Sequence, residues 1–262
     1  MTDAVDSEID ASKAPLLDHL IELRRRLIYC IVAVAVTFGL ALYFSDHVFA
    51  FLLHPLKTAG QNKVIYTQIF EAFFVRVKVA FFGAMMLSFP VIANQLWQFV
   101  APGLYRQEKR ALLPFLFATP LLFLTGAALA YFVAVPLALH YLLGFQGNLG
   151  GVRQEALPAI GNYLSFIMQF LFGFGLAFLL PVLLMLLERA GIVTRRQLIG
   201  ARRYAIVGAT AIAAVLTPPD LMSQVLLAVP LIVLYEAAII GIWFTERSRA
   251  REAKRSEVAA ES

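Results

Sequence analysis

The sequence has a single cysteine, Cys30, and only 15% of its 262 residues are charged. One thiol excludes an internal disulfide and a metal centre built from cysteine pairs. The patterns GxSxG, HExxH, Walker A and GxGxxG are also absent, and with them the signatures of common hydrolases, zinc proteases and nucleotide-dependent enzymes. We therefore expect a protein that is not an enzyme and that needs no cofactor or metal.

What the sequence has in abundance is apolar residues, at 60% of the chain and a mean hydropathy of +0.77. Soluble domains contain about 45–50% apolar residues, so this chain has too little polar surface to cover its own core in water. Its apolar residues gather in six runs, each of which we interpret as a helix that spans a lipid bilayer. The runs cover residues 27–44, 77–100, 112–139, 163–187, 204–216 and 221–244.

The connections between the runs alternate between strongly basic and nearly free of positive charge. One set carries clusters of Lys and Arg at 24–26, 106–110, 189–203 and 247–255. The other set has Lys57, Lys63 and Arg153, with Arg76 and Lys78 at the start of the second run. Basic loops stay in the cytoplasm, so this pattern predicts an all-α, polytopic membrane protein of six transmembrane helices with both termini cytoplasmic. The basic residues are dispersed and lack interleaved aromatics, which argues against nucleic acid as a partner.

We expect three segments along the chain. Residues 1–14 are polar and acidic and predict a disordered cytoplasmic N-terminus. Residues 15–244 form a single six-helix transmembrane domain, and residues 245–262 form a basic and acidic cytoplasmic tail. The first apolar run is 18 residues long. It exceeds the apolar core of a secretory signal, so we interpret it as a retained span.

The fifth run is unusually short. Its 13 residues reach only about 20 Å as a helix, whereas the hydrocarbon core is about 30 Å thick. Either the bilayer thins beside it, or the helix extends into its loops and the mismatch shrinks. The sixth run contains Pro230, where we expect a break.

The unusual polar groups are carboxylates at the cytoplasmic edge. Glu22 and Glu108 both lie among arginines and lysines. Glu22 can pair locally with Arg25 or Arg26, three and four residues on, and Glu108 can pair within its own loop. The functional alternative is that the two carboxylates bind an external guanidinium group in a bidentate manner.

Two other polar residues lie in the sixth run. Glu236 is costly inside a membrane and must face protein or water, and Gln224 near the outer end can join helices or bind a partner. Glu236 leaves open an alternative function, a proton-coupled secondary transporter of small molecules, although such transporters show internal repeats and this chain has none. A membrane-embedded protease using Ser165 and His140 lacks any supporting motif.

Several motifs together resemble the TatC family, the multispanning receptor of the twin-arginine protein translocase. They are His-Leu-Ile-Glu-Leu-Arg-Arg-Arg at 19–26, Ala-Pro-Gly-Leu-Tyr at 101–105 with Glu-Lys-Arg at 108–110, Phe132 with Pro136, Asn-Tyr-Leu-Ser-Phe at 162–166, and Leu-Thr-Pro-Pro-Asp at 216–220 with Ser-Gln at 223–224. They occur in the family's order and extend over nearly the whole chain, from about residue 16 to residue 244.

The resemblance implies a receptor in the bacterial inner membrane that binds the paired arginines of signal peptides on folded cargo, through Glu22, Glu108, His19 and Arg24. It implies a concave, glove-like bundle and export driven by the proton-motive force. It also implies single-span TatA-like and TatB-like partners that dock near Gln224, Asp220 and Thr217, and a homo-oligomer within a larger complex.

One position departs from the family pattern. Leu179 stands in the fourth run where relatives often carry an acidic or amide residue. A polar contact inside the concave face is therefore in doubt, and we consider Gln169, ten residues earlier, as an alternative source of polarity.

Overall fold

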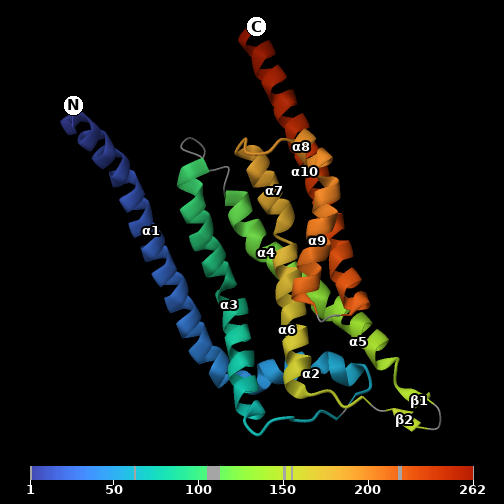
Figure 1. The fold of residues 1–262 in the computed structure, drawn as a ribbon. Helices are drawn as coiled ribbons and strands as arrows, with labels where there is room; N and C mark the ends of the chain where they lie inside the picture. Colours follow the sequence, from blue (N-terminus) through green and yellow to red (C-terminus); the bar gives the residue numbers. More distant parts are fainter. Residues whose placement is uncertain are drawn as a thin grey trace. The chain divides into compact units, whose positions relative to one another are not determined.

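The computed structural model describes residues 2–61, 63–104, 113–149, 152–154, 156–217 and 220–261, and Figure 1 shows that these are almost entirely helical. The first half of the chain contains α1 (Thr2–Tyr43), α2 (Ser45–Thr58), α3 (Glu71–Leu104), α4 (Leu113–Leu129), the π-helical segment η2 (Ala130–Ala134) and α5 (Val135–Leu143). The second half contains the hairpin β1 (Gly147–Leu149) and β2 (Val152–Gln154), then α6 (Ile160–Ala177), α7 (Leu180–Arg189), α8 (Arg195–Gly200), α9 (Arg202–Leu216) and α10 (Leu221–Glu261).

The chain divides into two compact units. Unit 1 comprises Met1–Val48 and Arg76–Pro120, and unit 2 comprises Phe49–Val75 and Leu121–Ser262. In unit 1, α1 packs on α3 through small side chains, with Ala41, Ala80 and Ala84 buried together against Phe38. Small residues let two helix backbones approach closely, which is the usual way in which membrane helices associate.

Unit 2 is built around α6, whose buried face includes Leu164, Ile167 and Phe170. Close approach of α4 to α6 depends on glycine. A Cβ atom on Gly126 would lie 2.5 Å from the carbonyl oxygen of Phe174, so no larger residue fits there. The long α10 packs against α7 and α9.

Within the described residues, five helical segments are long and apolar enough to cross a membrane: His19–Tyr43, Glu71–Phe99, Leu116–Leu143, Ile160–Arg189 and Leu221–Ser248. Together with the shorter α9 they match the six apolar runs, which confirms the all-α polytopic fold. The cytoplasmic location of the termini and the concave, glove-like shape stay predictions. Helix α9 has 15 residues, or about 22 Å, so it gains little from its loops and is still shorter than a bilayer core of about 30 Å.

Proline shapes two of the spans. The fourth span is interrupted at Phe178 and Leu179, just before Pro181, which has no N–H to continue the α6 ladder. The third span contains η2 just before Pro136, and a local π-helical turn is one way in which a membrane helix accommodates a proline.

One expectation differs from the observed helices. The break expected at Pro230 is wrong, because α10 continues through it. A proline removes one hydrogen bond, and the packing of α10 on α7 and α9 holds the turns on either side. Helix α1 begins at Thr2. The disordered N-terminus over residues 1–14 stays a prediction, as do the other segment boundaries expected from the sequence.

The segment between α2 and α3 is attached to the start of α6. Glu71 accepts hydrogen bonds from the backbone N–H of Thr67 at 2.5 Å and from that of Gly161 at 2.9 Å. Ile65 also forms an isolated parallel bridge with Ala159. Because these bonds satisfy the backbone of an irregular segment, they hold it at the end of unit 2 that carries the hairpin.

Candidate functional site

The carboxylate of Glu22 lies at the contact between α1 and α3. Arg26, one turn later on α1, donates to Glu22 Oε1 from Nε at 3.1 Å and also from Nη2. The same guanidinium donates from Nη1 to Gln98 Oε1 on α3 at 2.8 Å, and more weakly to Gln95 at 3.4 Å. Arg26 therefore joins the two helices and orients Glu22 toward α3.

The contact with Arg26 uses only part of the hydrogen-bonding capacity of the Glu22 carboxylate. Its side chain is 34% exposed, and both bonds from Arg26 reach the same oxygen, Oε1. Among the described residues nothing hydrogen-bonds to Oε2 of Glu22. A carboxylate can accept on both oxygens, so Glu22 keeps the capacity to bind a second guanidinium group.

His19 belongs to the same side of α1 as Glu22. Its ring stacks on Phe99 of α3, with ring centroids 4.4 Å apart. Arg24 lies two residues from Glu22, a rotation of about 200° around the helix. It lines a separate shallow cavity with Ile21 and Ile28. The structure thus brings His19 and Glu22 to the α1–α3 contact and places Arg24 on another face.

Glu108 lies outside the described residues, so its convergence with Glu22 stays a prediction. The sequence predicts Arg26 only as a local partner of Glu22, and it does not indicate Gln98 or Phe99 at the site. Gln95 and Gln98 are three residues apart near the end of an apolar run, and that spacing is the signal that could have indicated a polar face on α3.

A second polar group lies where α9 turns into α10. Thr217 donates to the carbonyl of Ala213 at 2.8 Å, and Oδ1 of Asp220 caps α10 by accepting from the N–H of Ser223 at 2.7 Å. Oδ2 of Asp220 and the hydroxyl of Ser223 are buried and have no hydrogen-bond partner among the residues that the structure describes. Gln224 is part-buried, and its amide reaches the carbonyl of Thr210 at 3.4 Å. The turn therefore contains buried polar groups with unused bonding capacity.

Glu236 is not an isolated carboxylate. Arg202, at the start of α9, donates to its Oε2 at 2.7 Å, and the two side chains are 49% and 39% exposed. The neighbouring Tyr235 donates to the carbonyl of Leu198 in α8 at 2.7 Å. Glu236 thus fastens α10 to α9, an arrangement that argues against the alternative of a proton-coupled transporter.

The two positions of the fourth span at which a polar side chain was considered, Leu179 and Gln169, have different surroundings. Gln169 is exposed on α6, and Leu179 lies in the turn that separates α6 from α7. Ser165 donates to the carbonyl of Gly161 on its own helix at 2.7 Å, a common helical back-bond that does not prepare the hydroxyl for nucleophilic attack.

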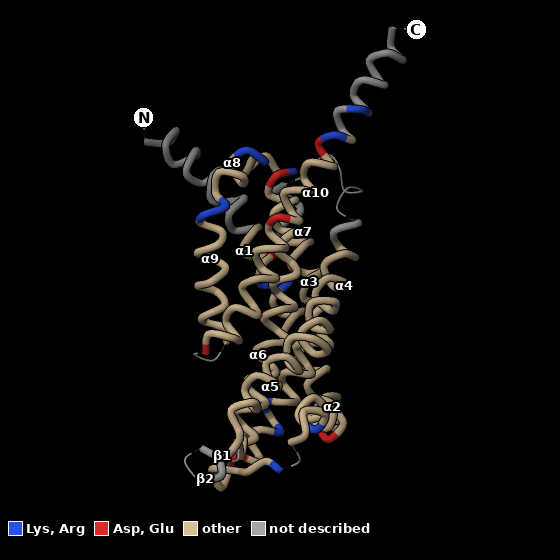
Figure 2. The backbone as a smooth tube through the Cα atoms, turned by 90° about the vertical axis from the view of Figure 1, so that its right-hand side faces the viewer, with Lys and Arg blue, Asp and Glu red and all other residues tan. Residues whose placement is uncertain are grey.

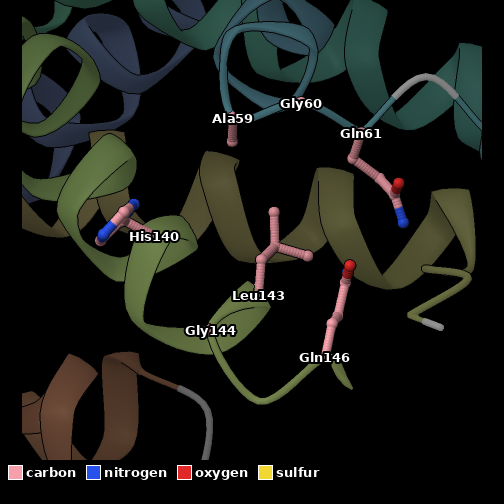
Figure 3. Close-up of a pocket in the computed structure, with 7 residues that line it drawn as sticks. All are labelled: Ala59, Gly60, Gln61, His140, Leu143, Gly144 and Gln146. Carbon is pink, nitrogen blue, oxygen red and sulfur yellow. The ribbon is translucent and has the colours of Figure 1, made fainter. Parts of the chain in front are cut away.

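A small cavity lies at the hairpin end of unit 2. Figure 3 shows Leu143 of α5 pointing toward the loop of Ala59 and Gly60 across it, with His140 to one side and Gln61 to the other. The lining contains no carboxylate, so the cavity lacks a partner for His140 in acid–base chemistry. Among the described residues, no group of three or more His, Cys, Asp and Glu side chains is placed to hold a metal ion.

Comparisons with known proteins agree on one family. The family model described as "Sec-independent protein translocase protein (TatC)" matches residues 18–230. The chain is 46% identical over 242 residues to the protein of that name from Magnetococcus marinus, covering 92% of this chain and 88% of the relative. It is 41% identical to the protein of that name from Escherichia coli K12, covering 88% of each chain.

Solved structures lead to the same family. The structure titled "Crystal Structure of Twin Arginine Translocase Receptor- TatC" is 40% identical, with a TM-score of 0.76 over 85% of this chain and 96% of that chain. The chain therefore belongs to the TatC family: it is a subunit of the Sec-independent protein translocase, a multi-pass protein of the bacterial inner membrane that serves transport and is not an enzyme.

Proposed function

We propose that this subunit is the receptor for twin-arginine signal peptides and that Glu22 accepts one of the two arginines. The observation that carries the proposal is the second carboxylate oxygen of Glu22, which none of the described residues bonds. A guanidinium group binds a carboxylate oxygen strongly because the hydrogen bond joins opposite charges. Glu108 accepts the other arginine, and His19 forms part of the same surface.

Arg26 orients the Glu22 carboxylate without blocking the binding of a signal arginine. In the unloaded protein its charge balances that of Glu22, and its bonds keep the carboxylate in one orientation. When a signal arginine binds, Arg26 retains the amide oxygens of Gln98 and Gln95 as acceptors. Binding of the signal arginine therefore does not leave the part-buried guanidinium group of Arg26 without hydrogen-bond partners, which would be energetically costly.

The direct test is binding of a twin-arginine signal peptide to the purified protein in nanodiscs. We expect Glu22→Gln to weaken binding about tenfold, the loss of one charge-assisted contact, and Glu22→Gln with Glu108→Gln to weaken it further. Asp46→Asn removes the same charge from a carboxylate that is paired with Arg76 at 2.7 Å, and we expect no change. Equal binding by the double variant and the unaltered protein would refute the assignment.

We propose that TatA-like and TatB-like single-span partners dock at the turn between α9 and α10. Oδ2 of Asp220 and the hydroxyl of Ser223 support this, because groups buried without a bond favour a partner that supplies one. Thr217 and Gln224 border the same turn. We expect Asp220→Ala to reduce co-purification of the partners, with Asp46→Ala as the control. Unchanged recovery would exclude this turn.

The remaining features of the proposal concern the assembly. The subunit works as a homo-oligomer within a larger complex, and the proton-motive force drives export of folded cargo. The short α9 thins the bilayer beside the docking turn, since about 22 Å of helix must bridge a core of about 30 Å. Lengthening α9 by one turn should restore normal thickness and lower export, measured on a reporter cargo.

A further inference from the structure

The connection between α7 and α9 contains an arginine whose bonding is incomplete. Nε of Arg195 is buried without a hydrogen-bond partner, and among the described residues no ion pair or hydrogen bond involves Arg195 or Arg196. The arginines that follow are different. Arg202 binds Glu236, and Arg203 lies over the ring of Tyr204 at 4.7 Å.

This incomplete arginine lies in a rigid segment. Thr194 and Gln197 form a reciprocal capping box at the start of α8, with Gln197 Oε1 accepting from the N–H of Thr194 at 2.8 Å. Leu198 is buried in a cluster with Tyr235, Ile239 and Ile242 of α10, so α8 is anchored to the bundle. Because the backbone is fixed, the absence of an acceptor for Arg195 is not explained by a disordered loop.

The segment also lies beside the end of a span, where lipid headgroups are expected. It directly follows the fourth span, which ends at Arg189, and Figure 2 shows its basic stretch at the end of unit 2 opposite the hairpin. Ile192 and Ile199 flank the arginines and are 60% and 37% exposed. Exposed isoleucines beside unpaired cations suit a surface that meets acyl chains and headgroups together.

From this geometry we infer that Arg195 and Arg196 bind the phosphate of an anionic phospholipid. A guanidinium group can present two N–H groups side by side to one phosphate, and rotation of the Arg195 side chain would turn its unsatisfied Nε–H toward such a ligand. Basic sites beside the cytoplasmic ends of spans are typical places for anionic headgroups. Only side chains of the protein bind the phosphate in this proposal, and Ile192 and Ile199 contact the acyl chains.

The test uses the full chain in detergent, titrated with phosphatidylglycerol or phosphatidylcholine, with retained lipid counted by native mass spectrometry. We expect the unaltered protein to retain phosphatidylglycerol preferentially. Arg195→Gln should weaken retention about tenfold, and Arg196→Gln about threefold, because loss of one good ionic contact corresponds to about tenfold in affinity. Lys57→Gln, an equal change of charge on α2, should have no effect.

Two further arms separate the explanations. Arg195→Lys keeps the positive charge but loses the planar pair of guanidinium donors. If those donors bind phosphate, lipid retention should fall to a level between that of Arg195→Gln and that of the unaltered protein. Inorganic phosphate at millimolar concentration should not displace the lipid, and displacement would identify free phosphate instead and overturn the lipid proposal. Equal retention of both lipids, or equal retention by Arg195→Gln and the unaltered protein with matching circular dichroism, would also overturn it.

Discussion

Helix α1 and the α6–α7 span are both strongly apolar and have very different surroundings. The most apolar stretches of the two have mean hydropathies of 2.0 and 2.6, yet 6% of the α1 stretch is buried within the protein and 44% of the α6–α7 stretch. Hydropathy therefore decides that a helix enters the bilayer and leaves open whether lipid or protein covers it. The exposed helix carries Glu22, the residue that we propose for recognition, while the buried one organises unit 2.

The largest effect that tests this contrast is expected when glycines are replaced by alanine. In Gly126→Ala the new Cβ atom would meet the Phe174 carbonyl at 2.5 Å and the Phe178 ring at 2.9 Å. Since the backbone of α6 cannot move away, we expect the free energy of unfolding to fall by about 3 kcal/mol. Gly39→Ala on α1 meets nothing within 4 Å and should be neutral or stabilising by up to about 1 kcal/mol. Denaturant titration followed by circular dichroism in detergent measures both, and equal losses would end the contrast.

A smaller effect is expected from tyrosine hydroxyls. Tyr163 on α6 donates to the carbonyl of Leu52 at 2.8 Å in a buried setting, so Tyr163→Phe should lower stability by about 1.5 kcal/mol. Tyr29 on α1 is exposed and accepts from Arg25 at 3.3 Å, and Tyr29→Phe should change stability by less than about 0.5 kcal/mol. The same unfolding titration compares them. A larger loss for Tyr29→Phe would mean that α1 is better packed than its exposure indicates.

The polar network of α1 should matter less for stability than for binding. Arg26→Gln removes the bonds to Glu22 and Gln98, and we expect a loss of about 1 kcal/mol because both partners are near water. Signal-peptide binding should weaken more than this, since Glu22 loses its orientation. Isothermal titration with the peptide, beside the unfolding titration, separates the two effects, and an equal change in both would assign Arg26 to packing alone.

The smallest expected effect concerns the ion pair between α9 and α10. Arg202 and Glu236 are 49% and 39% exposed, so solvent screens their attraction and the coupling should be about 0.5 kcal/mol. A double-mutant cycle with Arg202→Gln and Glu236→Gln measures it directly. A coupling several times larger would show that this end of α10 lies in a medium of low dielectric constant.

Much of the fold could be read from the chain because it depends on local composition. Runs of apolar residues indicated the spans, and the short fifth run reappears as the 15-residue α9. Local reasoning failed at Pro230, where neighbouring helices maintain α10, and it did not foresee the interruption at Phe178 and Leu179. Proline has a fixed local effect, but surrounding contacts decide whether a helix tolerates it.

The candidate site could be predicted only in part. Glu22 and His19 were identified from a motif. Gln98, which accepts from Arg26, and Phe99, which stacks on His19, lie more than 70 residues away from these partners along the chain, and the contacts form only when α1 packs on α3. Likewise, nothing in the spacing of Arg202 and Glu236 suggests an ion pair, because they belong to different helices.

The sequence by itself determined that this protein inserts into a bilayer and which residues form its helices, because the free energy of transferring side chains from water to lipid is a sum over neighbouring residues. Only the tertiary structure decided which carboxylates are paired, which glycines are closely packed and which helix keeps a free face. These properties depend on contacts between residues distant along the chain, and local composition does not contain that information.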